Sequence, residues 1–204
     1  TLAISHSSAL GSVTSGTVVS SGATLWLQGD LSIGNESLSL SGVGVSSLGA
    51  LRNNSGNNTW GGTISLTGAS TIYADAGLLT LSPSNGNAIS STNFGLTLNA
   101  SSNSVGGVIS GTVVLGSGGI SQSNGFYTLM VGNSYSGATS VSGIMNIRNG
   151  GSLGSGVVTV VNGHTVQLQG GISVANAITL SGQGVSSLGG IRSISGVNTL
   201  SGVI

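Results

Sequence analysis

The sequence contains a long internal repeat, and this feature limits the possible folds more than any other. Residues 41–52 (SGVGVSSLGALR) return as residues 181–192 (SGQGVSSLGGIR), an offset of 140 residues. The match extends upstream and downstream with small drifts in offset, pairing 24–33 with 165–174, 4–11 with 147–154, 58–59 with 198–199 and 62–64 with 202–204. Residues 1–64 are thus similar to residues 144–204, and the chain holds about one and a half copies of the repeat.

Short runs in which aliphatic and small polar residues alternate recur throughout the chain. An apolar residue at every second position predicts a β-strand with one buried face. Gly, Asn and Ser, which suit the turns between strands, bound each run. Representative runs are Thr24–Gln28, Leu38–Ser41, Leu78–Ser82 and Thr165–Gln169.

A shorter period of roughly 20 to 25 residues is visible inside the long repeat. A period of this length is typical of the coils of a β-helix. We therefore predict an all-β fold, a parallel β-helix (β-solenoid) of short strands in which residues 1–204 form one continuous segment. About eight to ten coils, spaced roughly 4.8 Å apart, would make a rod about 40 to 50 Å long. Neither end is visibly capped, so we expect the segment to belong to a longer array or fibre, or to polymerise end to end.

Composition argues against several classes of partner. The chain has 38 glycines, only 3% charged residues, three arginines, no lysine and no net charge. Such a surface is a poor match for nucleic acid or acidic membranes. No apolar run approaches the roughly 18 to 20 residues that span a bilayer, so no membrane insertion is expected in this segment.

Residues 133–154 (NSYSGATSVSGIMNIRNGGSLG) carry a family resemblance. They resemble the autotransporter-associated β-strand repeat of bacterial autotransporter and adhesin passengers, and residues 2–11 look like the tail of a second copy. The matching positions are Asn133, Tyr135, Gly137, Thr139, Val141, Gly143, Ile147, Leu153 and Gly154. The turn after Val141 is one residue shorter than usual, and Met145 stands where Leu is commoner.

The resemblance implies a right-handed parallel β-helix that is secreted or carried on the outer surface of a Gram-negative bacterium. It carries over no catalytic residue. The matched segment covers only about a tenth of the chain.

Catalytic chemistry finds little support in the residues present. Enzymes on β-helices use clustered carboxylates, and the only acids here are Asp30, Glu36 and Asp75. Asp30 and Glu36 have no acidic equivalents in the second copy, which indicates solvated turn residues. His164 follows an Asn-Gly turn and is expected to be exposed. We therefore predict a non-enzymatic protein with no catalytic residue, cofactor or metal site.

Three residues are candidates for surface or lateral contacts: Trp26, Arg52 and Arg192. Alternation places Trp26 outward between Leu25 and Leu27. Arg52 and Arg192 occupy the same place in the repeat, where a guanidinium could bind corner carbonyls or contact a neighbouring rod. By contrast, Trp60 is expected in the core, and Tyr135 is expected to be structural.

The leading functional hypothesis is a structural or surface protein, namely a stiff β-solenoid stalk, an adhesin passenger or an extracellular fibre subunit. Its partners would be copies of itself, end to end or lateral, or glycans or proteins of a host or cell surface. The alternative is a ligand-binding face for glycans or ice, although threonines are scattered in the sequence. A polysaccharide-degrading β-helix enzyme is a weaker alternative because the necessary acids are missing.

Overall fold

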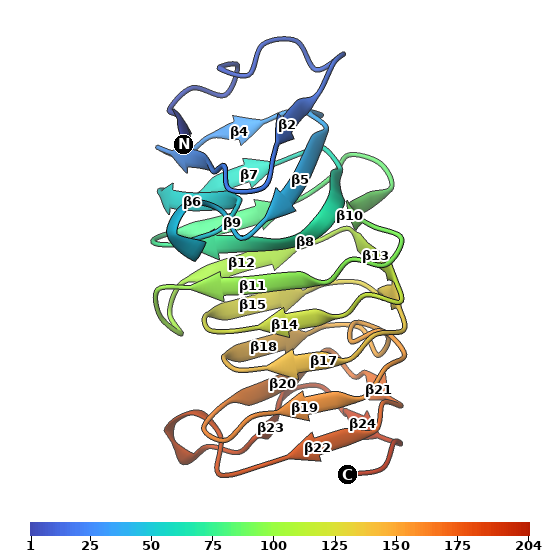
Figure 1. Cartoon of the computed structure of the whole chain (residues 1–204). Coiled ribbons are helices and arrows are strands. Elements are labelled where there is room, and N and C mark those ends of the chain that lie inside the picture. Colours follow the sequence, from blue (N-terminus) through green and yellow to red (C-terminus); the bar gives the residue numbers. More distant parts are fainter.

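The structure, a computed structural model that describes residues 1–204, is a parallel β-solenoid (Figure 1). The chain winds around one axis, and every strand pairs in parallel with at least one strand of a neighbouring coil. This confirms the predicted fold class. The helical content is limited to two short 3-10 turns, η1 (Val45–Ser47) and η2 (Val185–Ser187).

Strands stack into three faces along the rod. The first face is a ladder of nine strands, in the order β1 (Leu2–Ile4), β3 (Leu25–Gln28), β6 (Leu51–Ser55), β8 (Ile64–Ala74), β11 (Leu96–Ala100), β14 (Ile120–Gln122), β17 (Thr139–Val141), β19 (Val158–Val160) and β22 (Ile178–Leu180). These nine strands agree with the eight to ten coils predicted from the short period of the sequence.

The second face lies behind the first in Figure 1 and has eight strands. Its order is β4 (Ser32–Ile33), β7 (Asn58–Trp60), β9 (Leu78–Leu81), β12 (Gly106–Ile109), β15 (Phe126–Leu129), β18 (Ile144–Ile147), β20 (Thr165–Gln169) and β23 (Ile191–Ser195).

The third face is the least regular of the three. It contains β2 (Thr17–Val19), β5 (Leu38–Gly42), the first half of β8, β10 (Asn87–Ser90), β13 (Thr112–Gly116), β16 (Ser134–Tyr135), β21 (Ser173–Val174) and β24 (Thr199–Leu200). The eleven-residue β8 turns the corner without a break, so it pairs on the third face with β5 and β10 and on the first with β6 and β11.

The interior is filled by aliphatic side chains that stack in register from coil to coil. Leu25, Leu51, Ile72 and Leu98 form one such column, and each is at most 1% exposed. Forty buried apolar residues form a single cluster along the rod. Because one strand face points inward, the two-residue alternation seen in the sequence becomes a continuous core.

The two copies of the repeat build the same local structure at their corners. Thr24 Oγ1 donates to the carbonyl of Gly49 at 2.9 Å and accepts the N–H of Val45 at 2.8 Å. The second copy forms the same pair of bonds with Thr165, Gly189 and Val185. The serines of η1 and η2 adopt matching positive φ angles, at Ser46, Ser47, Ser186 and Ser187.

Equivalent strands of the two copies nevertheless lie on different faces. β3 belongs to the first face and its equivalent β20 to the second. β4 belongs to the second face and its equivalent β21 to the third. β2 belongs to the third face and its equivalent β19 to the first. Six first-face strands, from β6 to β19, lie between β3 and β20. The repeat therefore spans six turns and one third, about 22 residues per coil, and rotates the second copy by one face.

No helix in the chain has the length and apolar character needed to cross a bilayer.

Candidate functional site

An aromatic and guanidinium row lies on the outer side of the first face. Trp26 of β3, Arg52 of β6 and Tyr73 of β8 are register partners on adjacent strands. Trp26 points outward because its neighbours Leu25 and Leu27 are buried, as the alternation predicts. The row therefore brings together two residues that lie 26 positions apart in the sequence and a tyrosine from the next coil.

The Arg52 guanidinium is held from three sides. Its Cζ atom lies 4.9 Å from the centroid of the Trp26 ring and 5.7 Å from that of Tyr73. Its Nε and Nη2 donate to the two carboxylate oxygens of Asp75, the latter bond measuring 2.7 Å. These hydrogen bonds, together with the Asp75 charge, raise the pKa of Arg52 above its ordinary value despite partial burial. The Arg52 guanidinium therefore keeps its charge and is packed against two aromatic rings and a carboxylate.

This geometry corrects one hypothesis for the repeated arginines. Arg52 binds a carboxylate of the following coil and two aromatic rings, so the idea that it binds corner carbonyls is wrong. Arg192 lies on the outer side of the second face, with Gln167 as its register partner where Arg52 has Trp26. The same sequence position therefore has different surroundings in the two copies. A role in lateral contact stays a prediction for Trp26, Arg52 and Arg192.

Replacing Arg52 with alanine is expected to lower the free energy of unfolding by about 1 to 2 kcal/mol, because the bidentate bond and the stacking are lost and Asp75 keeps its charge. Arg192→Ala is the matched control and should cost less than about 0.5 kcal/mol. Urea denaturation of both variants measures the difference. Equal losses would show that the Arg52 cluster contributes nothing special to stability.

The three acids occupy three different environments. Asp75 is paired with Arg52, and Asp30 is an exposed turn residue with φ 61° whose Oδ1 accepts the N–H of Asn57. Glu36, in contrast, is only 2% exposed, so the expectation of a solvated turn residue was wrong for it. The expectation failed because Glu36 lies at the corner between β4 and β5, where Thr17 at the start of β2 contacts its carboxylate.

Glu36 has one hydrogen bond and one buried oxygen without a partner. Its Oε1 accepts the Thr17 hydroxyl at 2.7 Å, and its Oε2 is buried and unbonded. Pairing of β2 with β5 and of β19 with β22 aligns Glu36 with Asn176 of the second copy. The Asn176 amide donates to two carbonyls, those of Gly154 and Gly156.

We expect Glu36→Asn, which copies the second repeat, to stabilise the protein by about 1 to 2 kcal/mol, because it removes a buried carboxylate oxygen that lacks a partner. Asn176→Glu is the reciprocal variant and should destabilise, since it places a carboxylate against two carbonyls. Denaturant titration at neutral pH measures both changes. A loss of stability in Glu36→Asn would contradict this account of the corner.

Other side chains singled out in the sequence have structural positions. Trp60 is 0% exposed, as predicted, and Tyr135 is 4% exposed. His164 is only partly exposed and its Nδ1 is buried without a partner, so the expectation of an exposed histidine was wrong. No group of three or more His, Cys, Asp or Glu side chains comes together to hold a metal ion.

A continuous row of hydroxyl side chains runs beside the aromatic row on the first face. Its members are register partners on six successive strands: Thr71, Thr97, Ser121, Ser140, Thr159 and Thr179. Threonines that are scattered in the sequence are therefore aligned in space. Neighbouring hydroxyls repeat at the strand spacing of about 4.8 Å. Sequence reasoning missed this row because it depends on the length of every coil between its members.

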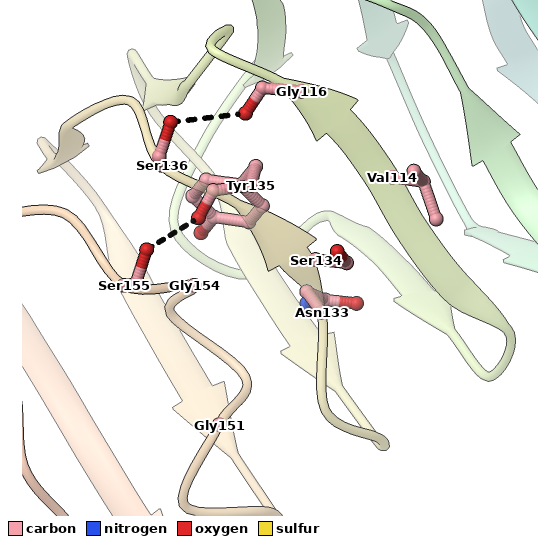
Figure 2. Close-up of a pocket in the computed structure, with 9 residues that line it drawn as sticks. All are labelled: Val114, Gly116, Asn133, Ser134, Tyr135, Ser136, Gly151, Gly154 and Ser155. Carbon is pink, nitrogen blue, oxygen red and sulfur yellow. Dashed lines mark hydrogen bonds between the residues drawn. The ribbon is translucent and has the colours of Figure 1, made fainter.

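A shallow groove crosses the third face where the strand ladder is interrupted between β16 and β21. One part of it has a volume of about 390 Å³, and Figure 2 shows the residues that line it, which are Val114, Gly116, Asn133, Ser134, Tyr135, Ser136, Gly151, Gly154 and Ser155. A second hollow shares Gly151, Gly154 and Ser155 with it. The lining combines hydroxyl, amide and backbone groups with the apolar side chain of Val114 and carries no charge, so it offers no partner to a charged ligand.

Most residues that line this groove belong to the segment 133–154, and Tyr135 among them is fixed by hydrogen bonds. The Tyr135 hydroxyl bonds to Thr139 Oγ1 at 2.8 Å, and Thr139 Oγ1 donates to the carbonyl of Leu153. Burial raises the pKa of Tyr135 to about 12, so its hydroxyl stays protonated and serves as a donor. These contacts support the structural role that the sequence suggested for Tyr135.

Comparison with family models, curated proteins and solved structures finds no match for this chain.

Proposed function

We propose that this protein is a non-enzymatic structural element, a stiff β-solenoid that acts as a stalk, adhesin passenger or fibre subunit. The observation that supports this best is the uninterrupted parallel ladder of the first face over a continuous apolar core. Backbone hydrogen bonds directed along the axis and stacked aliphatic columns resist bending and local opening. The function is mechanical in this proposal.

The placement of the acids supports a non-enzymatic role. Asp75 is bound by Arg52, Glu36 is buried at a corner, and Asp30 serves a turn. A glycosidase-type mechanism requires two carboxyl groups facing one substrate bond. Incubation with assorted polysaccharides followed by a reducing-end assay tests this point, and release of reducing ends would refute it.

The autotransporter-like motif motivates the proposed location and partners. We expect the protein to be secreted or displayed on the outer surface of a Gram-negative cell, where it meets copies of itself or host glycans and proteins. Protease shaving of intact source cells, with detection of released peptides, tests the location. Recovery of the chain only after cell lysis would argue against it.

Trypsin resistance tests the stiff solenoid directly. The three possible cleavage sites are Arg52 and Arg192 within strands and Arg148 directly after β18, where its N–H bonds to the carbonyl of Leu129. Cleavage needs several residues to leave the ladder, so the native chain should be cut at least about a hundredfold more slowly than the heat-unfolded chain. Digestion of both forms at similar rates would reject a tightly packed rod.

The hydroxyl row favours one alternative function, recognition of a hydrated ligand such as ice or a glycan. Its regular spacing on a flat sheet is the specific observation in its favour. Thermal hysteresis measurements and a glycan array test the two ligands. Thr159→Lys places a long charged side chain in the row and should abolish either activity. A wild-type chain that is inactive in both assays would remove this alternative.

A further inference from the structure

An apolar row lies on the outer side of the second face. Leu78 of β9, Gly106 of β12, Phe126 of β15 and Ile144 of β18 are register partners on four successive strands. Leu78 is 39% exposed, and Phe126 and Ile144 are partly exposed. Gly106 is itself buried, and the space beside it is filled by the backbone of Phe126. This row differs from the first face, where the corresponding outward positions carry hydroxyls.

Opposite charges lie at the two ends of the same face. Arg192 is in β23, the last strand of the ladder, while Asp30 is exposed two residues before β4, its first strand. The ion pair between Arg52 and Asp75 accounts for one arginine and one acid, and Arg192 has no such partner within its own chain. The charges of this face are therefore separated along the rod.

We infer that the second face is a self-association surface on which two copies dock with their rods antiparallel. The inference rests on the structural role proposed above and names its lateral partner as a second copy. The two-fold axis would run along the strand direction between β12 and β15, the midpoint of the ladder order. With this axis, β12 of one copy faces β15 of the other, β9 faces β18, β7 faces β20, and β4 faces β23.

This operation brings apolar side chains together at the middle of the face and opposite charges together at its ends. Leu78 meets Ile144 of the second copy, and Phe126 in β15 lies against β12 of the second copy. At the ends, Arg192 faces the start of β4, where Asp30 of the second copy lies within the reach of an arginine side chain. Because the interface is isologous, each of these contacts occurs twice.

Electrostatics select this arrangement over the other possible two-fold docking. A two-fold axis parallel to the rod would place each strand against its own copy, so the two Arg192 residues would lie close together. Like charges brought together oppose docking, whereas opposite charges set the orientation and speed the encounter. The antiparallel arrangement replaces one repulsive pair with two attractive ones.

The size of the face predicts a weak dimer. Eight strands at about 4.8 Å spacing and four residues of about 3.3 Å each give a contact of roughly 34 by 13 Å. The two copies would together bury roughly 900 Å², less than the roughly 1,600 Å² of a standard stable interface. We therefore expect association in the micromolar to millimolar range, with the small apolar centre limiting its strength.

Cysteine crosslinking of the intact chain tests the contact and its orientation, since the chain has no native cysteine. Leu78→Cys and Ile144→Cys proteins are each oxidised alone and as a mixture. The mixture should form a disulfide dimer at least about tenfold faster than either protein alone. Thr159→Cys, on the first face, is the control partner for Leu78→Cys and should crosslink at the slow rate. Equal rates in all mixtures would overturn the inference.

A charge-swap experiment tests the ends of the interface. Arg192→Glu should weaken association by about tenfold, because both ends of the dimer become repulsive. Adding Asp30→Asn should recover most of this loss, and Asn tolerates the positive φ of the Asp30 turn. Arg148→Glu makes the same charge change away from Asp30 and should alter association by less than about twofold. Sedimentation equilibrium up to about 1 mM measures the constants.

The outcomes separate this inference from the proposed function. A chain that remains monomeric over that range and gives no selective crosslink, yet resists trypsin, would overturn the dimer and leave the structural role in place. A chain that trypsin digests readily would instead reject the stiff solenoid itself.

Discussion

Replacing Trp60 with alanine is expected to lower the free energy of unfolding by about 3 to 5 kcal/mol, the largest loss for any single truncation in this chain. Trp60 is the largest fully buried side chain, and its register partners are Ile33 in β4 and Leu81 in β9. Removing it leaves a cavity that crosses three coils. Guanidinium denaturation followed by circular dichroism measures the loss.

Two matched variants make this prediction specific. Leu200 is the repeat equivalent of Trp60 but is only partly buried in β24, so Leu200→Ala should cost no more than about 1 to 2 kcal/mol. Trp60→Phe retains most of the buried area and removes an indole N–H that has no partner, so it should cost much less than the alanine variant. Similar losses for Trp60→Ala and Leu200→Ala would contradict the packing described for β7.

The shape of the unfolding curve carries further information. A solenoid is stabilised mainly by contacts between neighbouring coils, so a cavity near one end can unfold part of the rod first. We expect Trp60→Ala to broaden the transition or split it in two, because coils on its N-terminal side lose their support before the rest. A single sharp transition at reduced denaturant concentration would show that the whole rod unfolds as one unit.

Replacing Gly154 with alanine is expected to cost about 2 to 4 kcal/mol. Gly154 has φ 64°, which disfavours residues with a Cβ atom, and a Cβ added there would lie 2.6 Å from both the ring and the carbonyl oxygen of Tyr135. Tyr135 is itself held by Thr139 and cannot retreat without breaking that bond. The third face would have to separate at the groove.

Gly163→Ala is the matched control for the conformational cost of placing a Cβ atom on a residue with positive φ. Gly163 has φ 82° but no atom within 4 Å of an added Cβ, so its substitution carries only the conformational cost of about 1 kcal/mol. The difference between the two variants isolates the contact with Tyr135. Thermal unfolding of both, with tyrosine fluorescence as a second probe, measures it. Equal shifts in Tm would show that the contact at Tyr135 relaxes without cost.

Local backbone geometry explains what the sequence could predict. A strand shows its side chains to alternate faces, so the pattern around Trp26 was sufficient to place Leu25 and Leu27 inside and the indole outside. The sequence repeat also indicated that the two copies share local structure, and Thr24 and Thr165 form the same two hydrogen bonds, although neither threonine was singled out from the sequence. Each of these features depends on contacts that one coil or its immediate neighbour supplies.

Contacts between coils were beyond the reach of pattern reasoning. Arg52 meets Asp75 because β6 and β8 pair in a particular register, and one residue more or less in the intervening corner would move the carboxylate to another position. The same dependence explains Glu36, whose carboxylate is contacted by Thr17 of β2 in the preceding coil. It also explains the hydroxyl row, whose six members align only after six coils have closed.

The two copies of the repeat show which features the sequence determines and which depend on the tertiary structure. The sequence alone determined the strand period, the corner chemistry, the parallel solenoid and the existence of two related copies, because these follow from local propensity and periodicity. Tertiary structure decided which face each copy occupies and how deeply its residues are buried: Leu40 in β5 is 0% exposed, and its equivalent Leu180 in β22 is 37% exposed. The physical reason is that a coil buries its side chains only against the coils stacked on either side of it. The face on which a given strand lies depends on the lengths of all the turns that precede it in the chain.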